Sequence, residues 1–184
     1  MYHVSNDVRA KKSAALICQG LGKCLEEKPL SSIRIMDIYE KCYVSRATFY
    51  RLFDDIRDVF IYECDNIFAD ILKMIENKKF QNKGEEAIFC IKRWLEHDTL
   101  MKALAENDLI GIIYDTHIRN SELLKRFYSI RFEDEKKVDY FIAILASLTY
   151  ASLTVYYNHG ATEPIEQVYD TVRKCTRILA DNFC

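Results

Sequence analysis

A short stretch in the first third of the chain carries guanidinium and hydroxyl groups at close spacing. The guanidinium of Arg46 can donate two parallel hydrogen bonds to a phosphate or to the edge of a guanine base. The hydroxyls of Thr48 and Tyr50 suit phosphate oxygens, and Arg51 adds a second cation. These groups predict a surface that binds a nucleic-acid backbone. The alternative is that both arginines are ordinary solvated charges and that Tyr50 is a half-buried core residue.

The same stretch carries the signals of a short helix over 46–53. Ser45 is a favourable N-cap, because its hydroxyl can accept a hydrogen bond from a backbone N–H two or three residues further on. Phe49 and Phe53 fall on the side opposite the polar groups, and we expect them to anchor the helix to a core. The sequence therefore predicts a short helix with one exposed polar side and one buried side.

Two further helices are needed to hold this one. Apolar residues within 7–27 recur at three- and four-residue steps, which predicts a long amphipathic helix after a short polar arm, 1–6. A short helix over 35–42 follows, and residues 43–45 form a break. Two short helices joined by such a turn and backed by a longer helix form a helix-turn-helix unit. We place this unit in residues 1–55.

The remaining residues, 56–184, predict a larger helical body. Only two prolines and five glycines occur in 184 residues, so the frequent turns that many strands require are disfavoured. Hydrophobic residues make up 49% of the chain, which is enough for a substantial core. The expected fold class is therefore all-α. Apolar periodicity predicts body helices over 55–78, 85–96, 99–106, 108–118, 121–130, 133–158 and 163–182.

The composition argues against several classes of protein. The net charge of −2 gives no whole-chain basic footprint. Seven cysteines without a Cys-x-x-Cys motif fit neither a zinc site nor a disulfide framework, which indicates a reducing cytoplasm. No catalytic triad, phosphate loop or metalloprotease motif occurs, so no cofactor is expected and a small helical enzyme is kept only as an alternative. We also expect charges to interrupt every apolar run before membrane-spanning length.

The segment from Val44 to Phe53 resembles the recognition-helix signature of TetR-type (TetR/AcrR-like) transcription regulators. The triplet Ala14-Ala15-Leu16 falls at the spacing of that family, and the resemblance covers about residues 9–63. It implies an all-helical homodimer with a DNA-binding head and an effector-binding body. The residues that the resemblance places at the DNA are Arg34, Met36, Ser45, Arg46, Ala47, Thr48, Tyr50 and Arg51.

Four residues depart from the pattern of the family. Tyr43 stands where glycine is usual, at a turn that favours a left-handed backbone. Tyr39 replaces a small alanine, and Arg34 replaces the usual serine or threonine cap of the second helix. Ile56 replaces a lysine that often binds phosphate, although the neighbouring Arg57 can compensate in part. These departures leave an alternative open: a relative that does not bind DNA and acts as a co-regulator through protein contacts.

The last two predicted helices carry long apolar stripes. A helix that is apolar nearly all round should be buried on several sides. We therefore expect both helices to pair with their copies in a second chain as a four-helix bundle; the alternative is burial within one chain. The residues expected at this interface are Leu148, Ser152, Tyr156, Val168, Val172, Cys175 and Leu179.

Aromatic and histidine side chains of the body are candidates to line a cavity for a small-molecule effector; the alternative is that each is plain core or surface. The candidates are Trp94, His97, Tyr114, His117 and Tyr128. By the resemblance, the chain is a ligand-responsive repressor that binds a palindromic operator in double-stranded DNA. An effector that binds one spacing of the paired heads more tightly would then shift the population and change the affinity for DNA.

Overall fold

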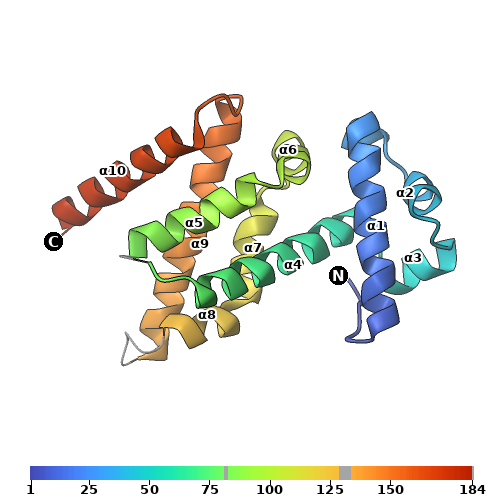
Figure 1. Cartoon of the computed structure of the whole chain (residues 1–184), viewed down its shortest axis with the longest axis horizontal. Coiled ribbons are helices and arrows are strands. Elements are labelled where there is room, and N and C mark those ends of the chain that lie inside the picture. Colours follow the sequence, from blue (N-terminus) through green and yellow to red (C-terminus); the bar gives the residue numbers. More distant parts are fainter. Residues whose placement is uncertain (81–82, 129–133, 184) are drawn as a thin grey trace.

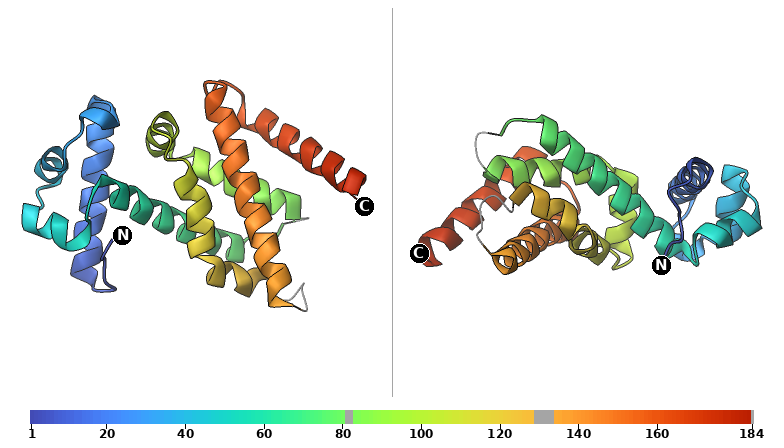
Figure 2. Two further views of the ribbon diagram at one scale, coloured as in Figure 1. Left: turned by 180° about the vertical axis from the view of Figure 1, so that it is seen from behind. Right: turned by 90° about the horizontal axis from the view of Figure 1, so that it is seen from below.

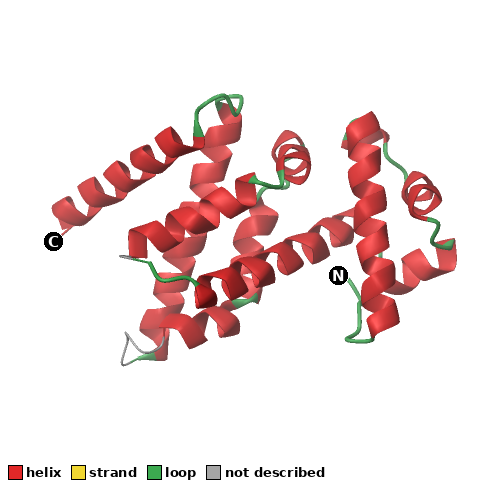
Figure 3. Ribbon diagram, in the orientation of Figure 1, coloured by secondary structure: helices red, strands yellow, loops and turns green. Residues whose placement is uncertain are grey.

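The computed structural model describes residues 1–80, 83–128 and 134–183, and all regular structure in these ranges is helical (Figure 3). The all-α prediction is confirmed, and the predicted helices are present with ends shifted by a few residues. Predicted helix residues 129, 130 and 133 lie outside the described part. The elements are α1 (Val8–Glu27), the 3-10 turn η1 (Leu30–Ser32), α2 (Ile35–Cys42), α3 (Arg46–Leu52), α4 (Ile56–Asn77), α5 (Lys83–Leu95), α6 (Asp98–Glu106), α7 (Gly111–Arg119), α8 (Ser121–Tyr128), α9 (Glu135–Asn158) and α10 (Ile165–Phe183).

Helices α1, α2 and α3 form a head at one end of the molecule (Figure 1). Its core includes Ile17 of α1, Ile38 of α2 and Phe49 of α3, each fully buried. Gly20 marks the closest approach of α1 to α2, because a Cβ atom there would lie 2.8 Å from the carbonyl oxygen of Ile38. The long first helix therefore acts as the backing that the two short helices need.

Helix α4 begins directly after the head and runs into the body, where α7 packs against it (Figure 1; Figure 2). Its first turn is fixed by the carboxylate of Asp55, which accepts a hydrogen bond from the backbone N–H of Asp58 at 2.9 Å. The carboxylate of Asp58 accepts in turn from the N–H of Asp54, at 3.0 Å. From this hydrogen-bonded start, α4 runs unbroken from the head into the body.

The N-terminal segment, predicted as a short polar arm, packs against the head and the start of the body. The backbone N–H of His3 donates to the carbonyl of Leu52 at 2.8 Å. The hydroxyl of Tyr2 donates to the carboxylate of Asp65 on α4 at 2.9 Å, and the Tyr2 ring meets the Tyr62 ring edge to face at 5.1 Å. The segment thus packs across the end of α3 and along α4.

Helix α9 packs against five other helices of the body: α5, α6, α7, α8 and α10. Its buried residues include Val138, Ile142, Ala146 and Leu153, which recur at near-helical spacing. Its other sides carry exposed apolar residues, among them Tyr140 and Ile144. One side of α9 is therefore core, and another is apolar surface.

Length and composition alone would allow one described helix, Lys136–Asn158, to cross a membrane, although a third of its most apolar window is buried inside the body. The prediction that charges interrupt every apolar run is wrong for this segment, because 140–158 contains no charged residue. Its apolar character is accounted for by the five helices packed against it and by the exposed stripe described below.

Candidate nucleic-acid interface

Helix α3 has the two-sided character that its sequence predicts. Phe49 and Leu52 are buried, with exposures of 0% and 2%. Four predicted DNA-contacting residues lie on its exposed side: Arg46, Ala47, Tyr50 and Arg51. The guanidinium carbon of Arg46 lies 5.6 Å from the centre of the Tyr50 ring, a cation–π contact that holds both side chains on one side of the helix. This surface combines cationic and hydroxyl groups without a competing carboxylate on α3.

The start of α3 is capped as predicted. The hydroxyl of Ser45 accepts a hydrogen bond from the backbone N–H of Thr48 at 3.1 Å, and the two hydroxyls lie 2.9 Å apart. Ser45 is exposed, but Thr48 is only half-exposed and its hydroxyl is already engaged. Thr48 therefore contributes first to the cap, and its oxygen is less free to bind phosphate than the sequence alone indicates.

The turn between α2 and α3 accommodates Tyr43 in the left-handed conformation, with φ 55° and ψ 32°. The side chain is 96% exposed, so it makes almost no packing contact that would compensate for the backbone strain. The turn is closed by a hydrogen bond from the N–H of Val44 to the carbonyl of Tyr39, at 3.2 Å. The helix-turn-helix geometry thus forms although glycine is absent.

The start of α2 uses a carboxylate in place of the usual hydroxyl cap. Asp37 accepts hydrogen bonds from the ammonium of Lys28 and from the backbone N–H of Arg34, both at 2.7 Å. Chiefly the Lys28 ammonium, and then the Arg34 N–H, hold the pKa of Asp37 below its usual value. The side chains of Arg34 and Met36 are exposed beside this first turn. Both predicted contacts are therefore accessible to a ligand.

The start of α4 offers little for a phosphate. The Ile56 side chain is half-buried against the core. Arg57 is exposed, but it lines a depression with Asp108, Tyr114 and Tyr150, which belong to the body. Compensation by Arg57 at the DNA is thus less direct than the sequence suggests.

The candidate effector residues are not brought together as one group. Trp94 and His117 are fully buried, with ring centroids 6.5 Å apart, and both contact the ring of Phe68. His97 is exposed just before α6, and Tyr114 lines the depression beside Arg57. The side chain of Tyr128 lies outside the described part of the chain. Of the five candidates, only Trp94 and His117 therefore lie together as the prediction of an effector site requires.

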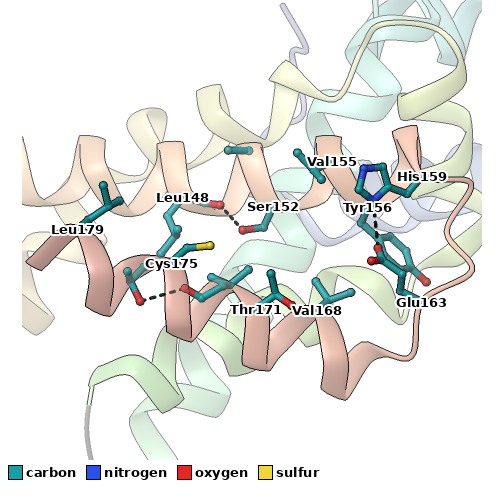
Figure 4. Close-up of a pocket in the computed structure, with 13 residues that line it drawn as sticks. Leu148, Ser152, Val155, Tyr156, His159, Glu163, Val168, Thr171, Cys175 and Leu179 are labelled. Carbon is teal, nitrogen blue, oxygen red and sulfur yellow. Dashed lines mark hydrogen bonds and ion pairs between the residues drawn. The ribbon is translucent and has the colours of Figure 1, made fainter.

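All seven residues predicted for the dimer interface line one groove between α9 and α10 (Figure 4). Its walls are largely apolar, and an ion pair between His159 and Glu163, 3.5 Å apart, lies at one end. Leu179 and Ile178 of α10 are 56% and 60% exposed, and Val155 of α9 is 51% exposed. The two last helices thus present a long apolar surface that one chain does not cover.

A cluster on α4 and α7 was not predicted from sequence. The guanidinium of Arg119 donates to Asp65 at 2.8 Å, and the amide of Asn120 donates to the same carboxylate oxygen at 3.3 Å. Tyr2 donates to the other oxygen of Asp65. These partners lie more than fifty positions from Asp65 in the sequence, so no local sequence pattern could predict the pairing. Within the described ranges, no cluster of histidine, cysteine and acidic residues is arranged to hold a metal ion.

Several solved structures resemble this chain, and two of them are described here. The crystal structure of Lin0861 from Listeria innocua matches with a TM-score of 0.66 and 19% identity, over 96% of each chain. The TetR family repressor AlkX from Dietzia sp. strain DQ12-45-1b, implicated in biodegradation of n-alkanes, matches with a TM-score of 0.63 and 15% identity, over 91% of this chain and 95% of that chain. No protein-family model and no curated protein sequence matches. At these identities the likeness establishes the fold, which is the all-helical fold of a TetR family repressor.

Proposed function

We propose that this protein is a DNA-binding transcription regulator whose head reads double-stranded DNA through α3. The observation that carries the proposal is the exposed cationic and hydroxyl side of α3, with Arg46 and Tyr50 in contact and Phe49 anchored behind them. A short helix of this kind fits a major groove, where arginine can read guanine and tyrosine can bind phosphate. The shared fold with a TetR family repressor supports the same interpretation.

The regulator acts as a homodimer. One short recognition helix reads few base pairs, whereas two of them about 34 Å apart read a palindrome on successive major grooves. The apolar groove between α9 and α10 supports a second copy as the occupant, because Val155 and Leu179 on its two walls are 51% and 56% exposed in one chain. Pairing of the same two helices from each chain gives a closed four-helix interface.

The regulator is a cytoplasmic, ligand-responsive repressor without catalytic activity. AlkX, which has the same fold, is named as a repressor, and this supports negative regulation by analogy alone. The continuous α4 between head and body offers a route by which an effector in the body changes the spacing of the two heads. Any such effect is reciprocal, since DNA must then change the affinity for effector by the same factor.

A second candidate function is that of a co-regulator that does not bind DNA. Two observations favour it: Ile56 is packed against the core where a phosphate-binding lysine is usual, and Arg57 lies beside body residues. The strained Tyr43, whose side chain is 96% exposed, is a further departure, at the turn. Such a protein would keep the fold and the dimer but lose the phosphate contacts.

Binding of a random duplex at several salt concentrations separates the two functions. A regulator that contacts phosphates binds more weakly as salt rises, with a slope set by the number of contacts. The matched control is Lys174→Ala, which removes an exposed cation from α10, far from the head in sequence. If the unaltered protein binds no duplex at low salt, DNA binding is refuted and the co-regulator stands. If it binds a duplex equally at all salt concentrations, the phosphate contacts are refuted.

A further inference from the structure

Two buried polar atoms in the core of the body have no hydrogen-bond partner among the described residues. They are Nε1 of Trp94 and Nε2 of His117. Both side chains have 0% exposure, so bulk water does not reach them. Buried polar groups in folded proteins nearly always have partners, and an exception points to a missing water or ligand.

The hydrogen-bonding roles of the two atoms are fixed. Nδ1 of His117 lies 2.7 Å from the carbonyl oxygen of Ile113, which can only accept, so Nδ1 carries the proton. Burial lowers the pKa of His117 to about 4, so the ring is neutral at neutral pH and Nε2 is a bare acceptor. Nε1 of Trp94 can only donate. The pair therefore demands a group that accepts one hydrogen bond and donates another.

Three helices supply this pair and the aromatic ring that contacts both of its members. The centroid of the Phe68 ring on α4 lies 4.3 Å from that of the His117 ring on α7. The same ring is stacked on the Trp94 ring of α5, with the two centroids 6.5 Å apart. The Trp94 and His117 rings are themselves 6.5 Å apart.

We infer that Trp94 and His117 form the polar end of the effector site, and that the effector is a small, uncharged, mainly apolar molecule with one hydroxyl group. The hydroxyl oxygen accepts from Nε1 of Trp94, and its hydrogen is donated to Nε2 of His117. A ketone satisfies only Trp94, and a carboxylate would lose its hydration without a cation to replace it. The inference rests on the proposed function, because it names the ligand class of the regulator's body.

The position of Phe68 connects this site to the head. Phe68 belongs to α4, whose first residue follows α3 by only a short linker. A molecule that enters between the three rings must displace Phe68 or one of its neighbours, because the rings are closed on one another. A shift of α4 then moves the head, which is how occupancy would change the affinity for DNA.

The single tryptophan of the chain makes the site directly observable, because all tryptophan fluorescence comes from Trp94. The probes are phenol and benzene, which differ by the hydroxyl alone, with excitation at the red edge of the indole band to avoid phenol itself. A plain apolar cavity prefers benzene, the more hydrophobic molecule. Two added hydrogen bonds make phenol bind about tenfold more tightly than benzene.

His117→Phe removes the acceptor while keeping an aromatic ring, so the preference for phenol is lost; Tyr140→Phe on the exposed surface is the matched control and retains it. His117→Gln keeps an acceptor and retains part of the preference. In the unaltered protein, the Nε2 resonance of His117 shifts with phenol and not with benzene, which tests the contact without a mutation.

The site is overturned if phenol binds no more tightly than benzene. It is also overturned if the Nε2 resonance of His117 does not shift with phenol, as expected when this atom hydrogen-bonds only a single buried water. The measurement needs no DNA, so its failure is distinguishable from failure of the proposed function. If phenol is preferred and no duplex is bound, the site stands and the regulator does not.

Discussion

Helix α1 contacts α2 closely at Gly20 but not at Gly22. We therefore predict that substitution by alanine has opposite effects on stability at these two glycines. In Gly20→Ala, the added Cβ would lie 2.8 Å from the Ile38 carbonyl oxygen and 3.0 Å from the Cβ of Cys42. Both are backbone or near-backbone atoms, so α2 must move. Gly22, two residues further along the same helix, has no atom within 4 Å of the equivalent position.

The expected magnitudes follow from these distances. Overpacking at Gly20 costs about 1–3 kcal/mol, and the better helix propensity of alanine offsets about 0.5–1 kcal/mol of this. We expect Gly20→Ala to lower the melting temperature by about 4 °C, and Gly22→Ala to raise it by about 2 °C. Because α2 positions α3, Gly20→Ala should also weaken duplex binding, whereas Gly22→Ala should not.

Thermal unfolding followed by circular dichroism measures the stability change, and fluorescence anisotropy with a labelled duplex measures binding. The reasoning is refuted if both substitutions change the melting temperature in the same direction. It is also refuted if Gly20→Ala destabilises the protein and leaves DNA affinity untouched, since α2 would then not position the recognition helix.

Three further predictions concern the turn, the body core and the interface. Tyr43→Gly relieves a left-handed residue whose side chain is 96% exposed, so urea unfolding should show a gain of about 0.5–1 kcal/mol, and an unchanged or lower stability contradicts the strain. The pKa of His117 is lowered from 6.5 to about 4, so the contribution of the neutral ring to the free energy of unfolding is complete above pH 6.5 and falls by roughly 3 kcal/mol as the pH drops to about 4. In His117→Phe this part of the pH dependence should disappear. A variant with the same pH profile as the unaltered protein would exclude His117 as its source. Leu179→Glu places a charge in the apolar α9–α10 groove and should prevent dimer formation. Light scattering at micromolar concentration should show a dimer for the unaltered protein and for Lys174→Ala, but a 21.6 kDa monomer for Leu179→Glu. A dimer of the Leu179→Glu variant contradicts the interface.

Local patterns were sufficient to predict the helices and the character of α3. Ser45 caps its helix through the backbone N–H of Thr48, and Phe49 and Phe53 are buried, because both features depend on residues within one or two turns. The α9–α10 groove was predictable for the same reason, since helical periodicity places its lining residues on common faces.

Contacts between distant segments were not predictable in this way. Asp65 joins Tyr2 and Arg119, which are separated from it by more than fifty positions on each side. The direction of Arg57 toward the body depends on how α4 lies against α7, and the grouping of Trp94 with His117 apart from His97 depends on the packing of α5 on α7. The apolar run of α9 was misjudged because its charges end before Tyr140.

The central claim is that the exposed side of α3 reads DNA, and variants of that side test it most directly on duplexes selected from genomic fragments by the unaltered protein. Tyr50→Phe should weaken all duplexes by a similar factor and reduce the salt slope by about one, because a phosphate contact is lost. Arg46→Ala should reduce the difference between selected and random duplexes, because a base contact is lost. If both variants bind the selected duplex as tightly as the unaltered protein does, α3 is not the recognition helix.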